Sequence, residues 1–174
     1  MKRMLILFLL FVLTRANAQN EFAATAFYTD FKKIFADAQA GFTDCKGIKR
    51  KSDFEELATE YYAKLMLPLA DSGKVVFPVA GNPYVIYYFE PDKIRLKVDQ
   101  RGANLRDAIA LAFEKPLYSR TSTTITDNQP FTSTLYYTDP NEDKYSAALF
   151  RQCIFYKGGK YYLSFEIRGK KDPE

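Results

Sequence analysis

Two adjacent glycines near the C-terminus constrain the fold of this 174-residue chain more than any other feature. Gly158 and Gly159 separate two segments rich in β-branched and aromatic residues, 145–156 and 160–168. A two-residue turn with positive φ at both positions favours a tight β-hairpin, and glycine adopts that conformation without steric cost. Such a turn also determines which residues lie opposite each other. The sequence therefore predicts both a hairpin and its register.

That register divides the hairpin into two chemically different faces. The mostly apolar face contains Phe150/Ile167, Gln152/Phe165, Ile154/Leu163 and Tyr156/Tyr161. The second face contains Arg151/Glu166, Cys153/Ser164 and Phe155/Tyr162. Arg151 and Glu166 meet as opposite charges, which supports the register. We therefore expect Cys153 to point away from the main apolar face.

The remaining elements predict an α+β fold. Apolar residues recur at spacings of three and four between Glu21 and Ala40, which predicts an amphipathic helix ended by Gly41. A second helix is predicted over 104–114, with Asn104 as its N-cap. Further strands are predicted over 61–67, 75–79, 84–89 and 131–138. We expect a mostly antiparallel sheet that is packed on one face by the N-terminal helix and the mid-chain helix.

Polar connections separate these elements. Residues 42–52 and 119–130 are polar segments without a regular apolar period. Ser52 and Glu55 match a capping box, which predicts a short helix near Asp53. No internal repeat, low-complexity segment or long linker divides the sequence. The length of residues 19–174 suits a single domain.

The first eighteen residues have the three parts of a secretory signal peptide. Lys2 and Arg3 precede ten uncharged apolar residues (4–13), and Ala16-Asn17-Ala18 supplies small residues at the −3 and −1 positions of a cleavage site. Ten apolar residues are too few to span a bilayer. We therefore expect residues 1–18 to be removed from an exported protein, periplasmic or secreted, whose mature chain has no transmembrane anchor.

Removal of the signal peptide changes the charge of the protein. The full chain has 25 basic and 21 acidic residues, which gives a net charge of +4. Three of the basic residues and none of the acidic ones lie in residues 1–18, so the mature chain carries a net charge of +1. A nearly neutral exported chain lacks the electrostatic footprint of a nucleic-acid-binding protein. We expect a protein, a peptide or a small ligand as its partner, and no nucleic acid.

The absence of histidine from the sequence excludes several classes of chemistry. Ser-His-Asp catalysis, Cys-His catalysis and His-ligated zinc all need an imidazole. Glycine-rich phosphate loops and the Ser-x-x-Lys nucleophile are absent as well. Asp139, Asn141 and Asp143 have the spacing that opens a calcium loop, but Lys144 stands where an EF-hand needs glycine. We predict no catalytic residues, no metal ligands and no cofactor.

Cys45 and Cys153 are the two cysteines of the chain. In an oxidising compartment, two thiols most simply form one disulfide, which would draw the connector after the first helix onto the second face of the sheet. Two unpaired structural thiols are the alternative. A reactive cysteine has little support because the sequence has no CxxC motif and no histidine to activate a thiolate. We predict a Cys45–Cys153 disulfide.

Four Tyr-Tyr doublets lie in predicted strands, at 61–62, 87–88, 136–137 and 161–162. Because successive strand residues face opposite sides of a sheet, each doublet is expected to direct one ring inward and one outward. Tyrosine suits a half-buried strand, and it is also enriched at interfaces. The second property predicts a binding surface made of Tyr62, Tyr87, Tyr136 and Tyr162.

Together these features predict a small exported protein that binds a partner or ligand and is not an enzyme. Two alternatives stay open. One is an envelope hydrolase, whose acids would have to converge in one cleft. The candidate acids for it are Glu55, Glu56, Glu60, Asp139 and Asp143. The other is a carrier that encloses a small apolar ligand between its first helix and a curved sheet.

Overall fold

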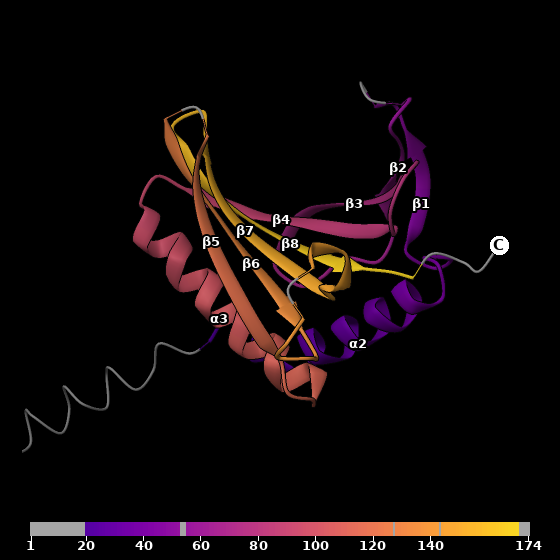
Figure 1. The fold of residues 1–174 in the computed structure, drawn as a ribbon, viewed down its shortest axis with the longest axis horizontal. Coiled ribbons are helices and arrows are strands. Elements are labelled where there is room, and N and C mark those ends of the chain that lie inside the picture. Colours follow the sequence, from indigo (N-terminus) through magenta and orange to yellow (C-terminus); the bar gives the residue numbers. More distant parts are fainter. Residues whose placement is uncertain (1–19, 53–54, 127, 143, 171–174) are drawn as a thin grey trace, which may run out of the picture.

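The computed structural model describes residues 20–52, 55–126, 128–142 and 144–170. Among these residues, two long helices accompany one antiparallel sheet of eight strands, in the order β1-β2-β3-β4-β8-β7-β6-β5 (Figure 1). This arrangement confirms the predicted α+β class. The predicted signal peptide, residues 1–18, lies outside the described residues, and so do Asp53 and Asp143.

A helix followed by four strands occurs twice along the chain. The first unit contains α2 (Thr25–Gln39), β1 (Lys46–Arg50), β2 (Ala58–Ala63), β3 (Ala70–Pro78) and β4 (Tyr84–Asp92). The second contains α3 (Arg95–Phe113), β5 (Tyr118–Thr126), β6 (Gln129–Tyr137), the short 3-10 helix η1 (Tyr145–Ala147), β7 (Phe150–Lys157) and β8 (Lys160–Arg168). The units meet where β4 pairs with β8, so β1 and β5 are the edges of the sheet.

Both helices lie against the convex side of the curved sheet (Figure 1). Aromatic rings join the layers: Phe35 of α2 and Phe113 of α3 each lie 5.4 Å from the ring of Phe150 in β7. The expectation that the N-terminal and mid-chain helices pack on one sheet face is therefore confirmed. No helix among the described residues has the length and apolar character needed to cross a membrane.

The helix α3 begins nine residues before the predicted N-cap, at Arg95. Asn104 consequently lies inside the helix. Gly102, which lies before the predicted N-cap, is buried within α3 and lets the helix approach β7 closely. A Cβ atom at Gly102 would lie 2.6 Å from Nε2 of Gln152. Close packing explains why a poor helix former occupies this position.

The C-terminal hairpin has the predicted register. Gly158 and Gly159 have φ values of 58° and 83°, as a tight two-residue turn requires. Every cross-strand pair predicted for this hairpin is present, from Phe150/Ile167 to Tyr156/Tyr161. Its first strand begins at Phe150, however, because residues 145–147 form η1.

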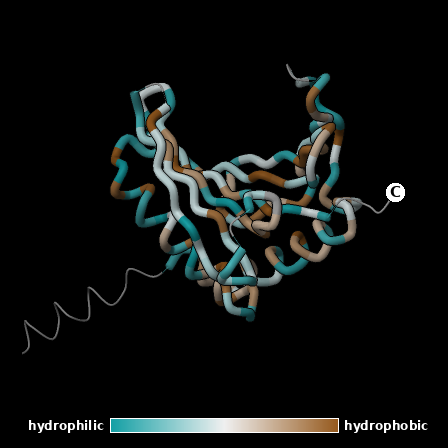
Figure 2. The backbone as a smooth tube through the Cα atoms, viewed as in Figure 1, coloured by the Kyte–Doolittle hydropathy of each residue, from teal (hydrophilic) through white to brown (hydrophobic). Residues whose placement is uncertain are grey.

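The two edge strands form in the segments predicted to be polar connections. The first, β1, lies within 42–52, and β5 occupies most of 119–130. All nine residues of β5 are exposed, and hydrophilic or intermediate residues dominate this strand in Figure 2. A strand without a buried face shows no apolar alternation, so the periodicity could not identify it. Residues 55–57 form a turn, so the short helix predicted near Asp53 does not extend into the described chain there.

Candidate functional site

The side of the sheet that faces away from α2 and α3 is its concave face (Figure 1). In the described residues, η1 lies over one end of this face, where Tyr145 contacts Arg168 of β8. Alternate residues of the strands supply the concave face, because successive side chains of a strand point to opposite sides. The same strands therefore build the helix-covered core and an uncovered surface.

The pairing register arranges the concave side chains in three rows that cross the sheet. The charged row consists of Tyr62, Lys74, Ile86, Glu166 and Arg151. The small-residue row consists of Ser72, Tyr88, Ser164, Cys153 and Ser133. The aromatic row consists of Tyr162, Phe155 and Phe131. Ionic, small and aromatic side chains thus lie side by side.

A pocket of about 190 Å³ lies between the charged and aromatic rows. Its position follows from the register, since the short side chains of Ser164 and Cys153 leave space between longer neighbours on both sides. The lining residues are Ile86, Tyr88, Phe131, Arg151, Cys153, Phe155, Ser164 and Glu166. A more open recess of about 550 Å³ adjoins it through Tyr88 and Phe155. The pocket is therefore apolar on one side and ionic on the other.

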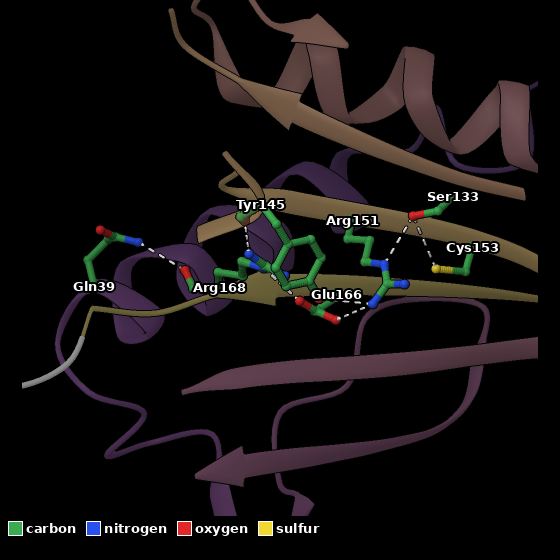
Figure 3. Close-up of polar contacts among 7 residues, drawn as sticks. All are labelled: Gln39, Ser133, Tyr145, Arg151, Cys153, Glu166 and Arg168. Carbon is green, nitrogen blue, oxygen red and sulfur yellow. Dashed lines mark hydrogen bonds and ion pairs between the residues drawn. The ribbon is translucent and has the colours of Figure 1, made fainter. Parts of the chain in front are cut away.

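Glu166 lies between two guanidinium groups on the charged side of the pocket (Figure 3). Its Oε1 accepts a hydrogen bond of 2.7 Å from Nε of Arg168, whereas its Oε2 lies 4.0 Å from Nη1 of Arg151. Arg168 also donates a hydrogen bond to the carbonyl oxygen of Tyr145. Its guanidinium carbon lies over the Tyr145 ring, 3.6 Å from the ring centroid. Only the shorter contact of Glu166 is a hydrogen bond, so Glu166 neutralises Arg168 more effectively than Arg151.

Neutral oxygens hold the Arg151 guanidinium in place. Its Nε donates to Oγ of Ser133 at 3.1 Å, and its Nη1 donates to the hydroxyl of Tyr145 at 2.9 Å (Figure 3). The side chain is 26% exposed, compared with 9% for Arg168. Burial lowers the pKa of Arg151, but Cys153, Tyr145 and Glu166 raise it by more, so the net shift is upward. Arg151 is therefore an oriented, permanently charged group that solvent still reaches.

A second ion cluster occupies the concave side of the first three strands. Glu60 of β2 lies 2.6 Å from Nζ of Lys74 and 3.5 Å from Nε of Arg50. Like the cluster around Glu166, it holds two cations and one carboxylate. These two clusters together contain four cations and two carboxylates, although residues 19–174 as a whole carry a net charge of only +1. Positive charge is thus concentrated on the concave face.

The predicted disulfide is absent from the structure, which has Cys45 and Cys153 as free, buried cysteines. Cys153 points to the concave face as predicted, but Cys45 lies on the helix side of the sheet, beside Tyr87. The carboxylate of Asp37 explains this placement, because it accepts hydrogen bonds from the backbone N–H groups of Asp44 and Cys45. The connector is therefore held against α2. Burial raises the pKa of both thiols, so neither supplies a thiolate at neutral pH.

The structure places two of the four predicted surface tyrosines on the concave face. Tyr62 is 56% exposed, and Tyr162 is partly exposed in the aromatic row. The prediction is wrong for the other two. Tyr87 is completely buried and donates to the carbonyl of Leu65, and Tyr136 is buried and donates to Gln152 beneath α3. The concave ring of the 87–88 doublet is Tyr88, and both rings of the 136–137 doublet are buried.

The candidate acids of a hydrolase lie in different environments. Glu55 and Glu56 are exposed in the turn before β2, and Glu60 forms the ion pairs described above. Asp139 is exposed beyond β6, and its Oδ1 accepts a hydrogen bond from the backbone N–H of Asn141, as in an ordinary Asx turn. Asp143 lies outside the described residues. No group of three or more Cys, Asp or Glu able to hold a metal ion occurs in the described part of the chain.

The concave pocket could be predicted only in part. The hairpin register already places Arg151 with Glu166, Cys153 with Ser164 and Phe155 with Tyr162 on one face. The walls supplied by other strands were missed, above all Tyr88 and Ile86 of β4. A usable signal existed: in 84–89 the alternate set that contains Val85 and Phe89 is the more apolar, which favours the other set for the exposed face.

No family model, curated protein or solved structure matches this chain. The chemistry of the concave face therefore has to indicate the function.

Proposed function

We propose that this protein is a non-catalytic binding protein that receives its ligand on the concave face of the sheet. One observation carries the proposal: an uncovered pocket separates an aromatic row from a charged row and contains the oriented guanidinium of Arg151. Binding sites typically combine apolar walls with a small number of placed polar groups. The predicted signal peptide adds that this binding takes place outside the cytoplasm.

The pocket walls are held in position before any ligand arrives. The ring of Phe155 stacks on that of Tyr162, with centroids 5.4 Å apart and an angle of 10° between the planes. On its other side, Phe155 stacks on Phe131 at 6.4 Å. Such contacts reduce the side-chain entropy that binding would otherwise cost. Preorganised walls favour a binding role for this face over a purely structural one.

The polar groups of the pocket support binding more than catalysis. Glu166 is engaged with Arg168, and burial raises the pKa of the Cys153 thiol above its ordinary value. A nucleophilic cysteine needs the thiolate form, and a catalytic acid pair needs two converging carboxylates. The described lining residues include one carboxylate, that of Glu166.

A ligand held between the helices and the sheet, as in the carrier alternative, has less support. The ring of Phe31 lies 5.5 Å from that of Phe150 and 6.5 Å from that of Phe165, so aromatic side chains fill the centre of this interface. All three rings are buried. We therefore place the ligand on the opposite face of the sheet.

Native mass spectrometry of the protein purified from its own organism tests the proposal. We expect a retained ligand on the wild-type protein and on Leu111→Ala, which truncates an exposed side chain of α3. We expect Phe155→Ala and Tyr88→Ala to lose it, because both remove pocket wall. Retention by the Phe155→Ala/Tyr88→Ala double variant, or loss caused by Leu111→Ala alone, would contradict binding on the concave face.

A further inference from the structure

We infer that the ligand is a small molecule with one anionic group on an aromatic or otherwise apolar body, and that Arg151 binds the anionic group. This inference rests on the proposed function, because it identifies what the concave pocket receives. It follows from the charge balance of the pocket, the depth of Arg151 and the nature of the opposite wall.

The charge balance of the cluster leaves Arg151 without a close counter-ion. Arg151 and Arg168 share the single carboxylate of Glu166, and this carboxylate hydrogen-bonds to Arg168 at 2.7 Å. The nearest contact of Glu166 with Arg151 is 4.0 Å long. A partly desolvated cation without a close anion is unfavourable. An anion in the pocket would complete the cluster.

The geometry of Arg151 suits a carboxylate or sulfonate. Its Nε is bound to Ser133 and its Nη1 to Tyr145, so the plane of the guanidinium is fixed while its edge lines the pocket. Hydrogen bonds between guanidinium groups and such anions are charge-assisted and directional. The remaining N–H groups of this guanidinium therefore need no further ordering before they bind an anion in the pocket.

The aromatic side of the pocket indicates that the rest of the ligand is apolar. Phe155 lies across the small-residue row from Arg151, and the Phe131 ring beside it lies 5.8 Å from the Arg151 guanidinium. Tyr88 borders both the pocket and the adjoining recess of about 550 Å³. A ring or short apolar chain would stack on these side chains while its anionic end reached Arg151. The recess allows the body to extend beyond the pocket toward Tyr162.

The depth of Arg151 favours a small molecule over a folded protein. The Arg151 side chain is 26% exposed, and the lining rings of Tyr88 and Phe155 stand beside the pocket that it enters. A slender group can enter a pocket of about 190 Å³, whereas the surface of a folded partner is broad and contacts rims more readily than recesses. We therefore commit to a small amphipathic anion.

Two fluorescent probes that share one aromatic body test this inference. 8-Anilinonaphthalene-1-sulfonate carries a sulfonate, and N-phenyl-1-naphthylamine is the same ring system without it. Titrations of the folded mature protein should give an affinity for the sulfonate at least about tenfold higher than for the neutral amine, a difference typical of one charge-assisted contact. Added salt should weaken binding of the sulfonate more than binding of the amine.

Variants separate the anionic contact from the apolar one. Arg151→Gln should lower the affinity for the sulfonate about tenfold and leave the affinity for the amine unchanged. The matched control is Arg106→Gln, which removes one positive charge from the exposed outer side of α3 and should change neither affinity. Phe155→Ala should lower the affinity for both probes. Circular dichroism should show that every variant remains folded.

Each outcome bears on one level of the proposal. Equal affinities for the two probes, or an Arg151→Gln variant that binds the sulfonate like the wild type, would overturn the anionic class and leave concave-face binding standing. Binding of both probes that survives Phe155→Ala would overturn concave-face binding itself. If neither probe binds the folded protein, or if native mass spectrometry finds a protein as the retained partner, the small-molecule class is wrong.

Discussion

The two faces of the sheet are built from the same strands but have opposite chemistry. On the helix side, Val85, Phe165 and Ile167 are completely buried beneath α2 and α3. On the concave side, most of the neighbouring residues are polar, ionic or partly exposed aromatic, as Arg151 and Phe155 illustrate, although Ile86 is aliphatic. A strand alternates faces at every residue. Adjacent positions can therefore serve stability and binding separately, and substitutions should separate the two.

The largest expected effect is a difference in unfolding free energy between the alanine variants of two phenylalanines in β7. Phe150 is completely buried and contacts rings from both helices, whereas Phe155 is partly exposed on the concave face. Phe150→Ala should lower the free energy of unfolding by about 3–5 kcal/mol, because it opens a cavity in the core. Phe155→Ala should cost about 1 kcal/mol. Urea unfolding of a protein comprising residues 19–174 measures both values.

Equal costs for the two alanine variants would break the comparison. In that case the aromatic row would be part of the folding core, and loss of ligand from Phe155→Ala could reflect instability. A loss of ligand binding with little loss of stability would instead assign the aromatic row to binding.

A smaller effect is expected from the buried carboxylate of the concave face. Glu166→Gln leaves the nearly buried guanidinium of Arg168 without its anion, so we expect a loss of about 2–3 kcal/mol in unfolding free energy. The matched control is Glu60→Gln, which disrupts the more exposed cluster with Lys74 and Arg50. That substitution should cost about 1 kcal/mol or less. A similar loss of unfolding free energy in both variants would show that burial does not determine how much each ion cluster contributes to stability.

The difference between the faces could be predicted from the sequence wherever a local signal determines it. The turn at Gly158 and Gly159 determines the register of β7 and β8, and that register places Arg151, Cys153 and Phe155 on one face together. Helix α2 was likewise evident from its 3.6-residue apolar period.

Contacts between residues far apart in the sequence account for the features of the two faces that could not be predicted. The contact of β4 with β8 joins residues about eighty positions apart, and no turn determines its register. Tyr87 rather than Tyr88 was therefore expected on the surface. The edge strand β5 buries no face, so it lacks an apolar period. Cys45 was misplaced for a similar reason, because the hydrogen bonds that hold its segment come from Asp37 on the preceding helix.

The smallest expected effect concerns Asp37, a carboxylate on the covered side of the sheet. Burial raises its pKa, but hydrogen bonds from the backbone of Asp44 and Cys45 and from the side chains of Cys45 and Thr43 lower it by more, so the net shift is downward. A carboxylate with a lowered pKa stabilises the folded state above its ordinary pKa and loses that contribution as the pH falls through the lowered value. Wild-type stability should therefore decline between about pH 5 and pH 2.

Asp37→Asn isolates this contribution, because asparagine keeps the shape of the side chain but does not titrate. The variant should be less stable than the wild type at neutral pH by about 1 kcal/mol, and the difference between them should shrink as the pH falls. Urea unfolding of both proteins at several pH values measures that convergence. A constant difference at every pH would mean that the Asp37 charge does not hold the Cys45 segment on the helix side. The placement of Cys45 would then depend on packing alone, and the covered face would need no ionised group to define it.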